Sequence, residues 1–112
     1  MDLTTPPPAA HPAVAELGIT PGGTATFVQL SSRFCRPCRA AHQVLERVAA
    51  TTPGVVHVDV DVTDHLALGE RLDVRATPTV LVLDADGVER ARVVGAPTLA
   101  QARAAVAALS AR

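Results

Sequence analysis

The sequence is poor in aromatic residues and carries no marked excess of charge. Its 112 residues include two phenylalanines, Phe27 and Phe34, and no tryptophan or tyrosine, so the core must be built from small aliphatic side chains. The formal net charge of −1 offers no field to attract nucleic acid or an anionic membrane. No apolar run approaches the roughly 20 residues that span a bilayer. Residues 1–12 lack the basic start and apolar centre of a signal peptide. These absences favour a soluble cytoplasmic protein without a membrane segment.

The length bounds the number of domains. A chain of 112 residues fits one domain and leaves no room for two. Residues 1–12 contain four prolines and little that can pack, which is typical of a disordered or extended tail. We therefore expect a Pro-rich tail over residues 1–12 and a single, monomeric domain over residues 13–112.

Cysteine is scarce, and both cysteines lie in one motif, Cys35-Arg36-Pro37-Cys38. A strand-like run over residues 25–30 precedes the motif, and a helix-like run over residues 39–50 follows it. The unpaired N–H groups of a helix N-terminus favour a thiolate over a thiol. A thiolate attacks a disulfide, and a second cysteine one helical turn away can resolve the product. The motif therefore indicates a redox-active pair.

Two other interpretations of the cysteines remain open at this point, an inert structural disulfide and half of a zinc site. A closed zinc site needs four ligands. The remaining soft candidates are histidines, and none is paired at ligand spacing: His11, His42, His57 and His65. The three aspartates between residues 59 and 64 resemble a metal cluster on paper, but strand ends and helix caps explain them better. We expect no metal on this chain.

The rest of the chain alternates strand and helix patterns. A buried stripe of Cys38, Ala41, Leu45 and Val48 recurs at three and four residues, as in a helix packed on one face. Charged residues in the last strand indicate an edge position. The order predicts a mixed sheet covered by helices. The expected strands span residues 24–30, 55–60, 79–83 and 88–94; the expected helices span 12–17, 39–50, 65–72 (with Thr63 or Asp64 as the N-cap) and 99–109 (with Thr98 as the N-cap).

Taken together with its surroundings, the cysteine motif resembles the thioredoxin family. The supporting features follow in one order: the Cys-x-Pro-Cys motif, Thr77-Pro78 opening a later strand, the Asp86-Gly87 hairpin, and Gly95-Ala96 before the last helix. The resemblance runs from about Thr24 to the C-terminus. It implies an α/β, thioredoxin-like fold with a central mixed sheet of four to five strands flanked by helices. Because the N-terminal part is short, the family's first strand would be missing or reduced to Gly18 and Ile19.

The resemblance also implies a role for individual residues. Cys35 would be the attacking thiolate and Cys38 the resolving thiol. Pro78 would be a cis-proline facing the disulfide, and the Thr77 backbone would pair with an extended client peptide. No cofactor is implied. The residues implied in substrate binding are Phe34, Arg36, Pro37, Thr77, Pro78, Gly95 and Ala96.

Three substitutions depart from the family's usual motif. Phe34 replaces the tryptophan before the first cysteine, and Arg36 replaces the glycine between the cysteines. Gln29 stands where the family has a buried aspartate that helps to deprotonate the resolving cysteine. A glutamine cannot take up that proton at ordinary pH. His57 lies near the matching region, and we expect it to substitute in part.

The arginines around the motif bear on the direction of the chemistry. Arg33, Arg36 and Arg39 all favour the thiolate and hence make the disulfide more oxidising. Because exposed charges contribute less than about 1 kcal/mol each, we expect a shift of tens of millivolts. The resulting hypothesis is a thiol–disulfide oxidoreductase that acts on disulfide-containing client proteins and is reduced by a thioredoxin reductase. The alternatives are a redox-inactive thioredoxin-like binding or scaffold module and an oxidising disulfide exchanger.

Overall fold

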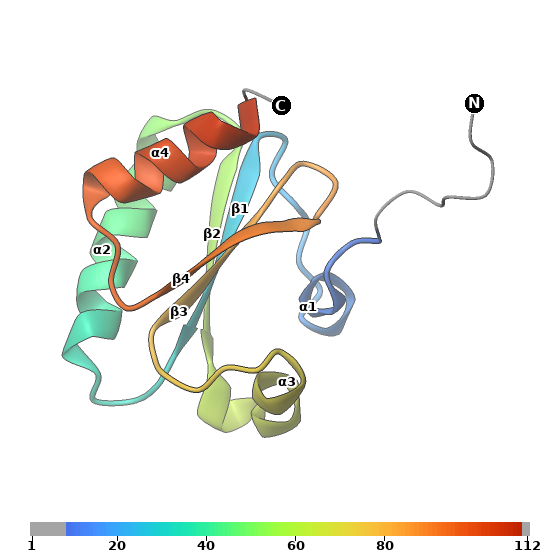
Figure 1. Ribbon diagram of the computed structural model, residues 1–112, viewed down its shortest axis with the longest axis vertical. Helices are drawn as coiled ribbons and strands as arrows, with labels where there is room; N and C mark the ends of the chain where they lie inside the picture. Colours follow the sequence, from blue (N-terminus) through green and yellow to red (C-terminus); the bar gives the residue numbers. More distant parts are fainter. Residues whose placement is uncertain (1–8, 111–112) are drawn as a thin grey trace.

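The computed structural model describes residues 9–110. Helices lie on both faces of a central sheet, with α2 and α4 on one face and α1 and α3 on the other (Figure 1). The elements in chain order are α1 (Pro12–Glu16), β1 (Ala25–Ser31), α2 (Arg36–Thr51), β2 (Val55–Asp61), a 3-10 turn (Val62–Asp64), α3 (Leu66–Arg71), β3 (Thr79–Leu83), β4 (Glu89–Val94) and α4 (Leu99–Ser110).

The four strands form one mixed sheet in the order β2-β1-β3-β4. Strand β1 runs parallel to β2 and antiparallel to β3, and β3 runs antiparallel to β4. The predicted mixed sheet is therefore confirmed, and β4 lies at the edge as its charged residues indicated. The parallel pair β1 and β2 is connected by helix α2, as a parallel crossover requires.

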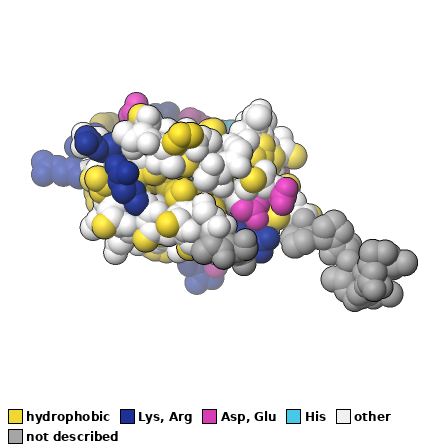
Figure 2. Space-filling model, turned by 90° about the horizontal axis from the view of Figure 1, so that it is seen from above, with side chains coloured by type: hydrophobic (Ala, Val, Ile, Leu, Met, Phe, Trp, Pro, Cys, Tyr) yellow, Lys and Arg dark blue, Asp and Glu magenta, His cyan; other side chains and the backbone are white. Residues whose placement is uncertain are grey.

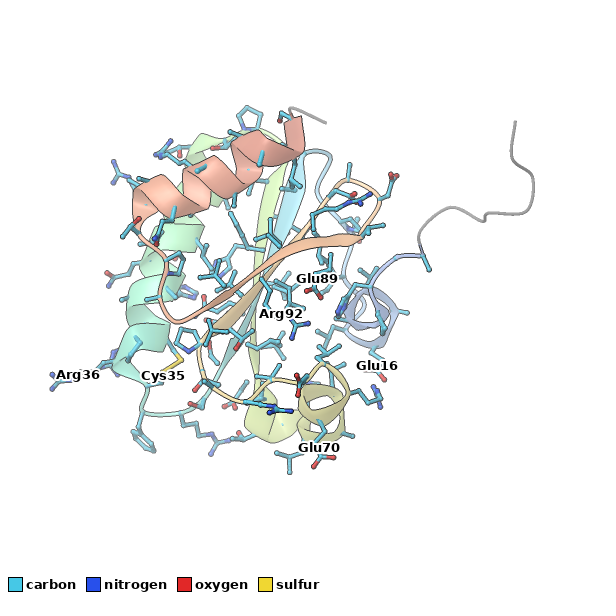
Figure 3. All side chains as sticks on the ribbon, in the orientation of Figure 1. Glu16, Cys35, Arg36, Glu70, Glu89 and Arg92 are labelled. Carbon is cyan, nitrogen blue, oxygen red and sulfur yellow. A yellow bond between two sulfur atoms is a disulfide. The ribbon has the colours of Figure 1, made fainter. Side chains whose placement is uncertain are left out.

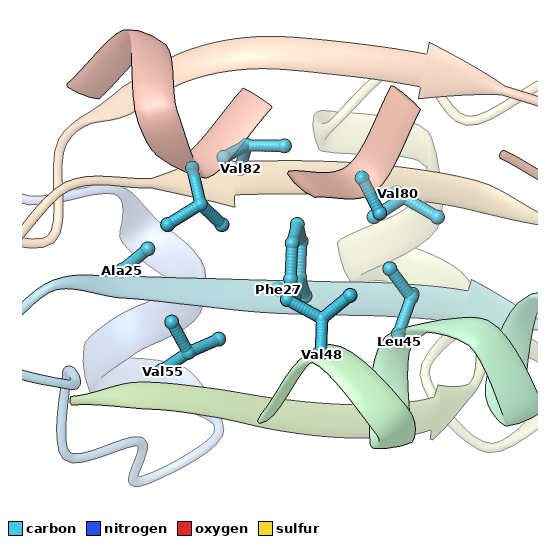
Figure 4. Close-up of a cluster of buried hydrophobic side chains, with 9 residues drawn as sticks. Ala25, Phe27, Leu45, Val48, Val55, Val80 and Val82 are labelled. Atoms are coloured by element: carbon cyan, nitrogen blue, oxygen red, sulfur yellow. The ribbon is translucent and has the colours of Figure 1, made fainter. Parts of the chain in front are cut away.

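Strand β1 is the centre of the core, since all seven of its residues are buried. Its side chains belong alternately to two hydrophobic clusters, because successive residues of a strand point to opposite faces of the sheet. Phe27 lies among the valines of the sheet and contacts the side covered by Leu45 and Val48 of α2 (Figure 4). Val28 and Leu30 belong to the second cluster, beneath α1 and α3. The helical stripe predicted for α2 is confirmed, since its four residues are all buried.

The N-terminal part differs from the expectation. No strand precedes β1 in residues 9–24, so Gly18 and Ile19 form no strand pairing. The expected tail ended at residue 12, and its residues 1–8 lie outside the described residues. His11 is instead packed, with a side chain only 8% exposed, and its N–H donates to the Gly87 carbonyl at 2.8 Å. The packed part of the chain therefore includes His11 and begins before residue 13. The His11 imidazole also caps α1, in the place of a serine or aspartate.

Two helix boundaries also differ. Helix α2 begins at Arg36 rather than at residue 39, because Cys35 acts as its N-cap. Helix α3 is shorter than expected, and neither Thr63 nor Asp64 caps it. The Asp61 carboxylate instead accepts a hydrogen bond from the Thr63 N–H at 2.8 Å and caps the 3-10 turn. The prediction that Thr98 caps the last helix is supported, since its hydroxyl accepts from the Gln101 N–H at 3.1 Å.

The surface carries no large apolar area on the side seen in Figure 2, where small hydrophobic patches alternate with polar atoms and charged side chains are scattered. Among the helices of residues 9–110, none combines the length and the apolar character needed to cross a bilayer.

The buried cap of α1 makes stability depend on pH. The His11 Nδ1 atom accepts a hydrogen bond from the Ala13 N–H at 3.1 Å, which requires that nitrogen to be unprotonated. Burial above all, and Arg92 as well, lower the pKa of His11 below 6.5, although Glu89 raises it. Below pH 6.5 the unfolded chain therefore binds more protons than the folded one. The free energy of unfolding falls as the pH drops from 6.5 towards the lower pKa that His11 has in the folded state.

We predict that His11→Asn removes part of this acid-side loss of stability, because asparagine caps a helix without titrating. Denaturant unfolding at a series of pH values measures the effect. His65→Asn is the matched control, since the His65 side chain makes no capping hydrogen bond. An identical pH slope in wild type and His11→Asn would show that the cap does not titrate.

Candidate active site

The two cysteines form a disulfide at the N-terminus of α2, with their Cα atoms 5.1 Å apart. The chain leaves β1 at Ser31 and turns through Phe34, whose φ of 56° lies in the left-handed region. Pro37 occupies the first turn of α2, where its missing N–H costs no hydrogen bond. The Cys35 sulfur accepts a hydrogen bond from the Cys38 N–H at 3.2 Å. The sulfur is thus held at the positive end of a 16-residue helix.

The cysteines differ in their access to solvent. Cys38 is buried, at 5% exposure, whereas Cys35 is half-buried. Figure 3 shows the disulfide at the end of α2, with the Arg36 side chain extending outward, away from the sulfur atoms. Cys35 is therefore the sulfur that another molecule can reach, and the Arg36 guanidinium lies in solvent rather than over it.

A loop from the other half of the chain meets Cys35, and a second loop supports it. The Thr77–Pro78 peptide bond is cis, and the Thr77 carbonyl oxygen lies 3.8 Å from the Cys35 sulfur. The hydroxyls of Ser32 and Thr77 are 2.7 Å apart. The Gly95 N–H donates to the Pro78 carbonyl at 2.8 Å. Of the expected substrate-binding residues, the structure thus places Thr77 against Cys35, and Gly95 is held against Pro78, the next residue of the same loop.

The other expected residues lie farther out on the surface. Phe34 is 98% exposed, which is unusual for a large apolar side chain. Arg36, Pro37 and Ala96 are also exposed. Phe34 lines a hollow beside the disulfide, whereas Arg36 does not.

Gln29 is fully buried beneath the disulfide and joins three elements. Its amide nitrogen donates to the Cys38 carbonyl at 2.7 Å and to the Ser31 hydroxyl at 3.0 Å. Its amide oxygen lies 2.9 Å from His57 Nε2. Because the amide nitrogen is taken up by two acceptors, the oxygen accepts and His57 Nε2 carries the proton. The side chain therefore ties β1 to α2 and β2.

His57 is partly buried and favours its neutral form. Burial is the main cause that lowers the pKa of His57, and the neighbouring His42 lowers it further, while Asp59 and Glu46 raise it. The expectation that His57 lies near the position beneath the disulfide is therefore supported. Its contact, however, is with Gln29 rather than with either sulfur atom.

Sequence reasoning named Arg39 as a charge beside the motif but, apart from the cysteines and Phe34, did not assign the other residues of the hollow beside the disulfide to the site. Besides the cysteines and Phe34, the hollow is lined by Ser31, Ser32, Arg39, His42, Gln43 and Asp59. His42 follows Cys38 by four residues and so lies on the same helix face, which was a usable signal. His57 and Asp59 face α2 because the helix covers that side of β2, and the sequence alone does not show which side it covers. The ring centroids of His42 and His57 are 4.9 Å apart.

A cysteine pair at a helix N-terminus, set against a cis-proline loop at one end of a mixed sheet, defines the class of thioredoxin-fold disulfide proteins. Comparison with known families agrees, since residues 19–110 match the family model described as a thioredoxin-like domain. The chain belongs to the thioredoxin family.

Individual relatives and structures support this assignment. A thioredoxin H-type from Oryza sativa subsp. indica is 35% identical over 74 residues, covering 66% of this chain and 60% of the rice protein. A thioredoxin from Chlamydia pneumoniae is 37% identical over 69 residues, covering 62% of this chain and 67% of its own length. The crystal structure of chloroplastic thioredoxin z has a TM-score of 0.76 at 23% identity and covers 96% of this chain and 99% of its own. The aligned region thus spans less than two thirds of the rice relative.

Replacing Gln29 tests its structural role. We predict that Gln29→Ala lowers the free energy of unfolding by about 2–4 kcal/mol, because it removes buried hydrogen bonds and leaves a cavity. Denaturant unfolding measures the loss. Gln43→Ala, an exposed change in the hollow beside the disulfide, is the matched control and should change stability by less than about 0.5 kcal/mol. Equal stabilities of the two variants would contradict the role assigned to Gln29.

Proposed function

We propose that the chain is a thiol–disulfide oxidoreductase that reduces or exchanges disulfides in client proteins. One observation carries the proposal. The accessible sulfur of Cys35 is held at a helix N-terminus, 3.8 Å from the Thr77 carbonyl, with Cys38 in disulfide contact behind it. The exposed sulfur is placed for attack and the buried one for resolution.

The reaction transfers two electrons from the cysteine pair to the client. The Cys35 thiolate attacks one client sulfur, forming a mixed disulfide and releasing the other client sulfur as a thiolate, which takes a proton. The Cys38 thiolate then attacks the Cys35 sulfur, and the second client sulfur leaves. The Cys35–Cys38 disulfide remains, and an external dithiol donor, a thioredoxin reductase in our proposal, returns it to the reduced state.

Client binding rests on the backbone around Thr77 and Pro78. An extended client segment pairs with this backbone as an added strand, which brings its disulfide over Cys35. The exposed Phe34 ring, which lines the hollow beside the disulfide, adds an apolar contact. Gly95, whose N–H holds the Pro78 carbonyl, supports the loop from behind.

Among residues 9–110, no carboxylate side chain is buried that could assist the resolving step. Gln29 does not ionise and donates to the Cys38 carbonyl rather than accepting from its thiol. In this proposal the Cys38 proton leaves through the hollow, which Cys38 shares with His42 and Asp59. The rate of resolution should therefore rise with pH over the range in which free thiols ionise.

Insulin reduction in the presence of a dithiol tests the activity. We predict turnover by the wild type, loss of turnover in Cys35→Ser, and accumulation of a mixed disulfide in Cys38→Ser. Arg103→Ala, an exposed change on α4, should keep the wild-type rate. A wild-type chain that does not reduce insulin would favour the binding or scaffold module.

The position of Arg36 predicts a small effect on the redox potential. Its side chain points into solvent, so we expect Arg36→Gly to make the potential more negative by about 20 mV at most, the equivalent of roughly 1 kcal/mol. Equilibration in graded glutathione buffers, with free thiols counted by alkylation, gives both values. A potential near about −270 mV would indicate a reductant, and one near about −120 to −180 mV the oxidising exchanger. A shift of more than about 60 mV would contradict the solvent-facing position of Arg36.

A further inference from the structure

A second group of chemically active side chains lies next to the disulfide. His42 on α2 and His57 and Asp59 on β2 each offer a ligand atom, and these atoms all lie within 4.8 Å of one another. His57 and Asp59 are two residues apart on one strand and so share a face. The proposed disulfide chemistry uses none of the three as a reacting group.

The spacing of two of these atoms suits a metal ion. His42 Nδ1 and Asp59 Oδ2 are 2.8 Å apart. Zinc–nitrogen and zinc–oxygen bonds of about 2.0–2.1 Å in a tetrahedron place neighbouring ligand atoms about 3.3 Å apart. An ion would therefore need only a small movement of these side chains to bind between them.

The outer contacts of both histidines also suit a metal ion. Histidines that bind metals usually donate their other N–H to a carboxylate or carbonyl oxygen. His57 Nε2 donates to the Gln29 amide oxygen at 2.9 Å, which leaves the lone pair of the neutral ring on Nδ1. His42 Nε2 lies 3.1 Å from the Glu46 carboxylate. Each ring thus has one nitrogen held by an acceptor, which leaves the other nitrogen as the one that can bind an ion.

We propose that His42, His57 and Asp59 form a binding site for a divalent transition-metal ion of the zinc class. A set of two imidazoles and one carboxylate favours zinc, whereas magnesium and calcium favour oxygen ligands. Three protein ligands leave a fourth position for water. When an ion binds Nδ1, the ring proton of His42 lies on Nε2, towards Glu46, and the ion takes the place of the contact between Nδ1 and Asp59. The ion would join α2, which carries the cysteines, to β2.

Titration of the oxidised protein with zinc chloride, followed by calorimetry, tests the site, since the disulfide keeps both sulfurs from competing. We expect one ion per chain. His42→Ala and Asp59→Asn should each weaken binding by more than about tenfold, and Glu46→Gln by about tenfold, the usual loss on removing an outer contact. His65→Ala, an exposed histidine outside the cluster, should bind as the wild type does.

Thermal unfolding provides a second measurement that also checks the fold of each variant. Zinc should raise the unfolding temperature of the wild type, because a ligand that binds only the folded state stabilises it, but not that of Asp59→Asn. Without zinc, Asp59→Asn should unfold close to the wild type, since the change is isosteric and partly exposed. Absence of zinc binding, binding that survives in both His42→Ala and Asp59→Asn, or an equal loss in His65→Ala would overturn the proposal.

Discussion

The buried amide of Gln29 is the interaction on which the disulfide site depends. Its hydrogen bonds join the central strand to the cysteine-bearing helix and to the neighbouring parallel strand. A polar group in a fully buried position is tolerated only when its hydrogen bonds are made, and all of those of Gln29 are. Because these bonds are costly to break, they hold Cys38 in place over the sheet. Cys38 thereby holds the turn that carries Cys35.

Above that anchor, the reactivity of the pair comes mainly from backbone groups. The Cys35 sulfur accepts from an N–H of the helix it caps, and the Thr77 carbonyl bounds its other side. The N–H belongs to α2, and the carbonyl belongs to the loop that leads into β3. The neighbouring arginine side chains are exposed, and solvent screens their charge. The helix terminus is therefore the more dependable source of thiolate stabilisation.

Local patterns predicted much of this arrangement. The strands, the stripe of α2 and the cysteine motif at a strand-to-helix junction could be read from periodicity, because each depends on neighbours close in sequence. The structure departs from the expectation where distant residues decide. His11 becomes a cap because its N–H donates to Gly87 in the β3–β4 hairpin and its side chain contacts Glu89. His42 and Asp59 meet only because β2 turns that face towards α2, which no spacing along the chain reveals.

The amide at residue 29 also explains why the buried residue beneath the disulfide has a structural role. A carboxylate here could serve as a base for Cys38, but it could not donate to the Cys38 carbonyl and the Ser31 hydroxyl as the amide does. The amide oxygen accepts from His57 and so fixes the ring proton on Nε2, which leaves the lone pair of the neutral ring on Nδ1. In this chain the buried residue holds the geometry of the site and does not transfer protons. The titratable side chains of His42 and Asp59 lie in the hollow beside the cysteines.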